Sequence, residues 1–429
     1  MKKAFPLIFM IAAMCIVPFG FITLPTTLSI SALSMYVSAL FGYIGTMMLL
    51  WMFILGARRI SRYFIRDYSV AMKIHNFLGK YGLMLILAHP ILVALGYGAS
   101  ILYAFVPNIS SDFEIYVSLG KIALFILILI WISSIKLRSK LRYKPWKYLH
   151  FLSYFIIPLV LIHIPFTGSN FAISLPAQIY FWLLFSGYLL FVIYRAYSWF
   201  GFDKCKYEII TNEKILDRVY EIKLRPLSNR TAIDIESGQY IYISKLKVTE
   251  SHPFSVASIN NDRTISIIYK TYGNFTKKLT NQISGQKIYV SGPYGDFLGE
   301  INDSEQNVFI AGGIGITPFI GSILKNPKNK YLIYANHDIG SAVYHDQLSS
   351  ALGDKLFDLI SVDEQGRRLL GRSEQSEKLK QIVRDNFNPS DKKINYYLCG
   401  PKPQVKSFIT TLKNAGVISG RIHSETFDF

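Results

Sequence analysis

The sequence has few cysteines, and none of them are close together. Cys15, Cys205 and Cys399 are the three cysteines in 429 residues, and no two form a CxxC pair. This spacing argues against a disulfide framework and against a zinc site. Unpaired thiols also fit a reducing compartment, which favours the cytoplasm for any soluble part of the chain.

Acidic residues are scarce as well, but only in one half of the chain. Residues 1–202 contain 3 acidic residues against 16 Lys and Arg, whereas residues 203–429 contain 25 against 30. The net charge of +18 therefore lies mostly beside apolar segments, where it indicates membrane topology rather than nucleic-acid binding. With 51% hydrophobic residues, the chain is expected to have membrane lipid as a partner and no nucleic acid.

Six apolar stretches are each long enough to cross ~30 Å of hydrocarbon as a helix. They cover residues 5–24, 35–56, 74–96, 117–137, 148–166 and 176–198. Basic residues cluster after the second stretch and between the fourth and fifth, so the positive-inside rule places both termini and the soluble half in the cytoplasm. The first stretch could also be a signal peptide, although it lacks a clear cleavage site, and its removal would leave the orientation of the rest unchanged.

All four histidines of the membrane half lie inside two of these stretches. His75 and His89 lie in the third, and His150 and His163 in the fifth. Two helices that each carry an inner and an outer histidine can form two facing pairs, which is the arrangement that axial ligation of two stacked haems requires. The pairing expected is His75 with His150 and His89 with His163. Packing histidines, or a membrane metal or proton path, are the alternatives.

The two spacings fit an ideal helix unequally. His75 and His89 are ~40° from sharing one face, but His150 and His163 are ~140° apart around the helix. Pro158 lies between the second two and suggests a local distortion that restores their facing. Phe155 could bridge the two haem levels, or could simply pack against lipid.

The soluble half begins with short strand-like segments at 206–210, 219–224, 240–243 and 264–269, which predict a small antiparallel barrel. Within it, Gly273-Asn274-Phe275-Thr276 opens a short helix and offers backbone N–H groups and a hydroxyl to a pyrophosphate, although the same pattern caps ordinary helices.

Strands and helices then alternate, with strands expected at 307–311, 330–335, 356–362 and 396–399, as in an open parallel sheet. The first strand enters Gly312-Gly313-Ile314-Gly315-Ile316-Thr317-Pro318, where a phosphate site is favoured over a plain tight turn; Thr317 is expected to cap the next helix and Pro318 to occupy its first turn. The last strand ends at Cys399-Gly400-Pro401, at the edge where a nicotinamide could lie. The aromatic tail, 424–429, has the composition of a disordered end.

In this order, the paired histidines and the motifs HPFS, GNFT, GGIGITP and CGP, followed by the aromatic end, resemble the NADPH oxidase and ferric reductase superfamily, and the bacterial NADPH oxidases most. The resemblance implies a six-helix haem-binding bundle (1–202), an antiparallel β-barrel that binds FAD (203–299) and an α/β domain that binds NAD(P)H (300–429), like ferredoxin-NADP reductases.

The resemblance also implies roles for individual residues. The four membrane histidines would ligate two b-type haems. His252, Pro253, Phe254 and Ser255, with Gly273 and Thr276, would bind FAD, and Gly312, Gly313, Gly315, Thr317 and Pro318 would bind the NAD(P)H phosphates. Cys399, Gly400 and Pro401 would lie beside the nicotinamide, and Phe427 would cover the flavin ring, with Phe429 as a second candidate.

Two positions depart from the family pattern. No basic residue follows the strand at Asn336-His337-Asp338 to meet the 2′-phosphate of NADPH, so NADH is expected to serve as well. Val93 replaces the polar residue that oxidases tend to have one turn beyond the outer ligand, which weakens the case for oxygen as acceptor.

The expected activity is electron transfer from cytoplasmic NAD(P)H through FAD and two haems to an acceptor outside. The acceptor is O2, giving superoxide, or a ferric or cupric chelate; a haem-bearing anchor that serves a partner protein is the other alternative. The expected location is a bacterial plasma membrane, with no obligatory protein partner.

Overall fold

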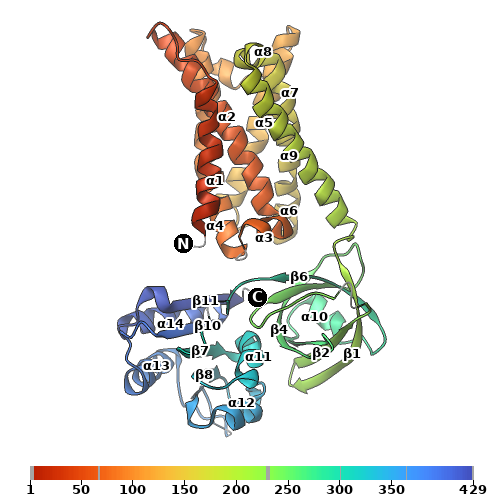
Figure 1. The fold of residues 1–429 in the computed structure, drawn as a ribbon, viewed down its shortest axis with the longest axis vertical. Coiled ribbons are helices and arrows are strands. Elements are labelled where there is room, and N and C mark those ends of the chain that lie inside the picture. Colours follow the sequence, from red (N-terminus) through yellow and green to blue (C-terminus); the bar gives the residue numbers. More distant parts are fainter. Residues whose placement is uncertain (1–3, 66–67, 229–231, 300, 364, 428–429) are drawn as a thin grey trace. The chain divides into compact units, whose positions relative to one another are not determined.

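A computed structural model describes residues 4–65, 68–228, 232–299, 301–363 and 365–427. The chain divides into two compact units, Met1–Tyr197 and Ser198–Phe429. The first consists of helices, and the second contains a β-barrel and a parallel sheet with helices on both faces (Figure 1).

Within the described residues, five helices of the first unit are long and apolar enough to cross a membrane. These are α2 (Ile30–Gly56), α4 (Tyr68–Gly96), α5 (Asp112–Ile135), the continuous segment Tyr143–Thr167 and α9 (Leu175–Trp199). The shorter elements are α1 (Phe5–Ile16), η2 (Val17–Gly20), α3 (Arg58–Phe64), η3 (Ile101–Ala104) and α8 (Ser169–Ile173).

The first predicted span is therefore shorter than expected. Instead of covering 5–24, the helix is α1, which passes into the 3₁₀ turn η2 at Val17 and ends at Gly20. Leu7 and Ile11 are nevertheless buried in the same hydrophobic core as α2 and α9, so α1 is part of the bundle.

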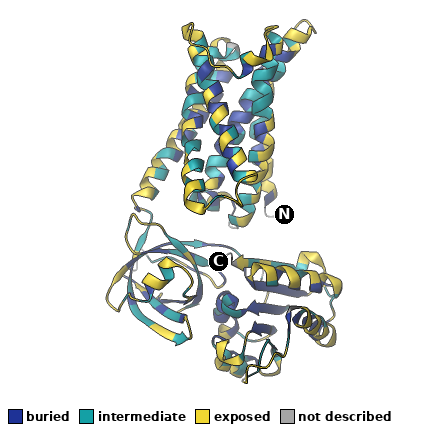
Figure 2. Ribbon diagram, turned by 180° about the vertical axis from the view of Figure 1, so that it is seen from behind, coloured by how far each residue is buried: buried dark blue, intermediate teal, exposed yellow. Residues whose placement is uncertain are grey.

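The bundle has an apolar surface as well as an apolar core. Its helices carry both buried and exposed residues, coloured dark blue and yellow in Figure 2, and large apolar residues of α9 are among the exposed ones. Trp182, Leu183 and Leu190 are 55%, 67% and 68% exposed. An exposed apolar surface on long apolar helices is what lipid contact requires, and this unit is an integral membrane domain.

The segment that carries His150 and His163 is not a uniform helix. It consists of α6 (Tyr143–Phe151), the 3₁₀ segment η4 (Leu152–Phe155) and α7 (Ile156–Thr167). The distortion expected near Pro158 is present as η4, which ends at Phe155, three residues before that proline. Four 3₁₀ residues overwind the helix by ~20° each, which reduces the ~140° offset between the two histidines to about 60°.

Two tyrosines of α9 donate hydrogen bonds to helix carbonyls that have no N–H donor because a proline lies four residues later. Pro158 has no N–H for the carbonyl of Tyr154, and the Tyr188 hydroxyl donates to that carbonyl at 2.9 Å. Likewise, Tyr180 donates at 3.4 Å to the carbonyl of Met14, four residues before Pro18. These bonds hold the interrupted helices against α9 at two levels.

The second unit begins with a closed antiparallel barrel, in the strand order β1-β2-β5-β4-β3-β6. The bounds are β1 (Cys205–Leu216), β2 (Val219–Pro226), β3 (Tyr240–Ser244), β4 (His252–Ile259), β5 (Ile265–Lys270), α10 (Asn274–Leu279) and β6 (Lys287–Tyr294). The predicted barrel is confirmed, but β4 and β6 were not predicted, because neither shows a clear apolar alternation. The HPFS segment forms the first half of β4.

A five-stranded parallel sheet follows, in the order β11-β10-β7-β8-β9. Its strands are β7 (Gln306–Gly312), β8 (Lys330–Asn336), β9 (Leu356–Ile360), β10 (Ile394–Pro401) and β11 (Ile422–Phe427), and its helices are α11 (Thr317–Lys325), α12 (His345–Leu352), α13 (Arg372–Asn386) and α14 (Lys402–Asn414). Much of the tail is therefore ordered as β11, contrary to the disorder suggested by its composition.

Candidate functional site

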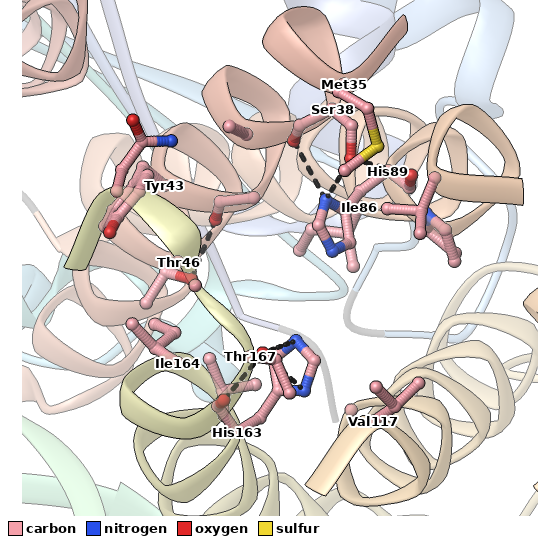
Figure 3. A pocket seen from close by; sticks show the side chains of 18 of the residues that line it. Met35, Ser38, Tyr43, Thr46, Ile86, His89, Val117, His163, Ile164 and Thr167 are labelled. Carbon is pink, nitrogen blue, oxygen red and sulfur yellow. Dashed lines mark hydrogen bonds between the residues drawn. The ribbon is translucent and has the colours of Figure 1, made fainter. Parts of the chain in front are cut away.

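The outer histidine pair, His89 and His163, faces a cavity of about 360 Å³ inside the bundle. His89 comes from α4 and His163 from α7, and Figure 3 shows both imidazoles pointing into the cavity. The centroids of the two rings are 6.4 Å apart. The structure thus brings together two histidines that are far apart in the sequence.

The inner pair, His75 and His150, is arranged in the same way. The ring centroids are 6.3 Å apart, and both residues line a second cavity of about 150 Å³. Leu49 lines both cavities, and is buried between the two levels. Phe155, the bridge considered from the sequence, is 61% exposed.

These separations suit one iron between the rings of each pair. Metal–imidazole bonds are about 2 Å long, so two rings that share one metal have centroids roughly 6 Å apart. Both pairs therefore have the spacing of axial ligands without further movement of the helices.

The hydrogen bonds of three histidines occupy Nδ1 and leave the Nε2 lone pair as the metal ligand. The Thr167 hydroxyl lies 3.4 Å from Nε2 of His163, but it donates to the His163 carbonyl at 2.7 Å. The Nδ1 atom of His75 lies 3.0 Å from the Met52 carbonyl, that of His89 lies 2.9 Å from the Ser38 carbonyl, and that of His163 lies 2.9 Å from the Tyr116 carbonyl. A carbonyl accepts, so each Nδ1 is the N–H donor and each Nε2 carries the lone pair. Ligating histidines are commonly fixed in this way.

His150 has a weaker partner, because its Nδ1 lies 3.3 Å from the Ser134 hydroxyl. The indole of Trp146 donates to the same hydroxyl at 3.3 Å, and its ring lies 5.2 Å from the His150 ring. None of these partners was predicted; a serine inside an apolar stretch, as at Ser38 and Ser134, was the only signal in the sequence.

Glycines allow the imidazoles to lie close to neighbouring helices. A Cβ on Gly42 would lie 3.2 Å from Cε1 of His89, and a Cβ on Gly120 would lie 2.9 Å from Nδ1 of His163. Because real Cβ contacts are longer than the second of these, Gly120 is part of the ligand cradle. Ring spacing, Nδ1 hydrogen bonds and glycine contacts together fit two haem groups.

The predicted flavin segment forms a cluster of aromatic side chains. His252 stacks on Phe275 with ring centroids 4.0 Å apart, and Phe254 lies 6.0 Å from the same ring. Burial lowers the pKa of His252, against the opposing charge of Glu250, which favours a neutral imidazole. Pro253 and Ser255 are neighbours in β4, paired with Tyr242 and Tyr240 of β3.

The structure also joins Gly273 to Thr276, but the threonine hydroxyl is already engaged. It accepts from the Gly273 N–H at 3.1 Å and donates to the Gly273 carbonyl at 3.0 Å. The sequence predicted that this hydroxyl and the backbone N–H groups would both face a phosphate. The backbone N–H groups therefore remain the stronger candidates for phosphate binding.

The glycine-rich loop after β7 packs directly on the end of β10. A Cβ on Gly315 would collide with the Cys399 carbonyl, and a Cβ on Gly400 would lie 3.2 Å from Gly312. Gly313 has a φ of +53°, a conformation that favours glycine. The two motifs predicted to hold the nucleotide are therefore adjacent, and only glycine permits this contact.

One local prediction in this loop is wrong. Thr317 is the first residue of α11 rather than its cap, and its hydroxyl donates to the Ile314 carbonyl at 2.8 Å. The 3₁₀ turn η6 (Gly313–Ile316) displaces the cap to Ile316. Pro318 lies in the first turn, as expected.

The chain end lies beside the predicted nicotinamide segment. β11 pairs with β10 so that Cys399 is opposite Glu425 and Pro401 is opposite Phe427. A Cβ on Gly295, just after β6, would lie 3.8 Å from Glu425 and 3.1 Å from the Tyr240 ring, so β11 also reaches the barrel. Phe429 lies outside the described residues.

The Cys399 side chain is 1% exposed and belongs to the hydrophobic cluster under the sheet. Burial, with a smaller contribution from the Glu425 charge, raises the pKa of its thiol well above the ordinary value. The part of Cys399 that meets the glycine loop is its backbone carbonyl.

Two sequence families match successive parts of the chain. The family described as ferric reductase like transmembrane component matches residues 11–161, and the FAD-binding domain family matches residues 215–298. A superoxide-generating NADPH oxidase heavy chain from Dictyostelium discoideum is 26% identical over 49% of this chain and 32% of its own length. The chain belongs to the NADPH oxidase and ferric reductase superfamily.

Further relatives of this superfamily member match about half of the chain. The flavohemoprotein of Rhizobium meliloti is 28% identical over 54% of the chain and 62% of its own length. The chain thus spans less than two thirds of the length of these curated relatives. A ferredoxin NADP+ reductase structure from Neisseria gonorrhoeae, with bound FAD and NADP, is 16% identical, covers 52% of this chain and 98% of its own, and has a TM-score of 0.44.

Proposed function

We propose that this protein is a transmembrane oxidoreductase that transfers electrons from cytoplasmic NAD(P)H, with FAD and two b-type haems as cofactors, to an acceptor on the opposite side of a bacterial plasma membrane. The two facing histidine pairs carry the proposal, because their ring centroids lie 6.3 and 6.4 Å apart and their Nδ1 atoms are already bonded.

The cofactors would supply the redox chemistry that side chains cannot perform. When bound, flavin accepts a two-electron hydride and releases single electrons, which haem can carry. The protein's part is to hold and orient the nucleotide and the cofactors. The two glycine-rich motifs would fix the nucleotide, the barrel would hold the flavin, and each histidine pair would ligate one haem iron, which would supply one-electron transfer.

The decisive experiment is a reduced-minus-oxidised absorption spectrum of the purified full chain, with haem content measured per polypeptide. Wild type is expected to show b-type bands and two haems, and His163→Ala about half of each. His150→Ala should remove the other half, so the two single variants check that loss follows the pair rather than a general failure to fold. A wild-type spectrum without b-type bands would refute the proposal.

The acceptor is proposed to be O2, giving superoxide, with ferric or cupric chelates as the second candidate. Val93 favours the second, since it lines the outer cavity one turn beyond His89 and offers no polar group there. Comparing the yield of superoxide with the rate of Fe(III) reduction by the purified protein distinguishes these two acceptors. Rapid NAD(P)H oxidation by the isolated chain would exclude a third possibility, an anchor that works only through a partner protein.

The donor is proposed to include NADH. Asp338 follows β8, where a cation would meet the 2′-phosphate of NADPH, and its hydrogen bond to His337 lowers the pKa of the Asp338 carboxyl, so the position stays anionic. We expect kcat/KM for NADH to equal or exceed that for NADPH in steady-state assays.

A further inference from the structure

Lys121 is a buried lysine inside an apolar membrane helix. Its side chain is 4% exposed, and α5, which contains it, has the highest mean hydropathy of the five long helices, 2.4. A charge in such a place is costly, and it is retained where it has a partner or a function. Sequence reasoning missed this residue, although it is the only charged residue in the stretch 117–135.

The contacts of the ammonium group with the described residues are one hydrogen bond and one aromatic ring. It donates to the Val106 carbonyl at 2.9 Å and lies 4.2 Å from the centre of the Tyr103 ring. Glu114 is the nearby acid and its charge acts on Lys121, but its carboxylate accepts from the Tyr103 hydroxyl at 3.2 Å, and the described contacts include no salt bridge between Glu114 and Lys121. An ammonium has three N–H groups, so donors remain for another acceptor.

Lys121 lies at the cavity of the outer histidine pair. It lines the 360 Å³ cavity together with His89 and His163, and its neighbour Gly120 is the residue whose Cβ would lie 2.9 Å from the His163 ring. The positive charge is therefore part of the wall of the space between the two outer ligands.

A purely structural role accounts poorly for the charge. Lys121 does tie the segment before α5 to the helix, but Ser118 already does so, because its hydroxyl donates to the Asn108 carbonyl at 2.7 Å and accepts from the Asn108 N–H at 2.8 Å. A neutral donor could equally bond the Val106 carbonyl without the cost of burying a cation.

We propose that Lys121 binds an anionic oxygen group in the outer cavity; this inference rests on the proposed function. Two sources present that chemistry. One is a carboxylate of the haem held by His89 and His163, and the other is an anionic acceptor that approaches the same haem from outside. A charge-assisted hydrogen bond to an oxyanion would use the remaining N–H groups of the ammonium in either case.

The test uses the purified full chain and three variants. Lys121→Gln keeps a donor for the Val106 carbonyl but removes the charge, Lys121→Arg keeps the charge, and Lys80→Met removes a lysine of α4 that lines neither cavity. The measurements are haem content, the midpoint potential of each haem, and KM for two acceptors of opposite charge, ferricyanide and hexaammineruthenium(III).

If the haem carboxylate is the ligand, Lys121→Gln lowers the potential or occupancy of the outer haem, and both acceptors are affected alike. If the acceptor is the ligand, KM for ferricyanide rises about tenfold or more while the haem potentials and hexaammineruthenium(III) kinetics hold. Lys121→Arg and Lys80→Met should resemble wild type in both cases.

A Lys121→Gln protein with wild-type haem content, potentials and ferricyanide KM would overturn the inference and leave Lys121 as a structural tie. This differs from failure of the proposed function, which would appear as an absence of haem from the wild-type protein and would overturn both. A melting temperature for each variant shows whether a loss comes from unfolding. If Lys121→Gln does not fold, Lys121→Met, which removes the same charge, replaces it in the test.

Discussion

At the residue scale, Gly120 illustrates how a missing side chain can define a ligand site. The His163 ring occupies the space where a Cβ would be, and it bonds the Tyr116 carbonyl from that position. We expect Gly120→Ala to displace the imidazole and to remove about half of the haem absorbance, like the loss of His163 itself.

Gly187→Ala is the matched control, since its Cβ would meet only Leu50 at 3.6 Å, an ordinary contact. It should retain the full spectrum. Equal spectra for the two alanine variants would show that the ring is not held against α5.

Cys399 leads to a prediction about reactivity. The thiolate is the nucleophilic form of cysteine, and burial raises the pKa of Cys399, so this form is scarce at neutral pH and rises only toward strongly alkaline pH. N-ethylmaleimide at pH 7 should therefore modify the partly exposed Cys205 and spare Cys399 until the protein is denatured. Mass spectrometry of peptides locates the label, and rapid labelling of native Cys399 would contradict the burial described.

At the scale of elements, α9 compensates for breaks in other helices. Tyr188 bonds a carbonyl that Pro158 leaves without its helical donor, at the 3₁₀ segment that turns His150 toward the cavity side. Tyr188→Phe should lower the free energy of unfolding by roughly 0.6 to 1.7 kcal/mol, the range of such bonds in membranes.

Tyr180→Phe provides the comparison, because its bond to the Met14 carbonyl is longer, 3.4 Å, and should be worth less. Unfolding of both variants in mixed micelles measures the difference. A larger effect at Tyr180 than at Tyr188 would be inconsistent with the geometry.

The same elements show where sequence reasoning succeeds. Long apolar stretches and strands that enter glycine-rich turns depend on local composition, so the membrane helices, β7 and β10 could be predicted. Which way the histidines face depends on helix geometry. The η4 segment, expected only as a distortion near Pro158, reduces the angular misfit of His150 and His163. β11 escaped prediction because it is defined by pairing with β10.

At the scale of the whole molecule, the site combines residues that no sequence pattern connects. The paired histidines could be proposed because ionisable residues are rare in apolar stretches. Three of them have main-chain carbonyls as partners, those of Met52, Ser38 and Tyr116, and a carbonyl occurs in every residue. The fourth, His150, has the Ser134 hydroxyl. The ligands could therefore be predicted, whereas the groups that orient them required the fold.

Orientation across the membrane is a property of the whole chain, and it can be tested with one introduced cysteine. Basic residues flank α3 and α6, so these ends and the barrel should face the cytoplasm and the segment before α5 the outside. In intact cells, a membrane-impermeant maleimide should label Ser110→Cys at once and Cys205 only after permeabilisation. Since Cys399 is buried, it gives no competing signal. Labelling of Cys205 in intact cells would place the reductase half outside, where cytoplasmic NAD(P)H could not reach it, and the direction of electron transfer proposed above would have to be reversed.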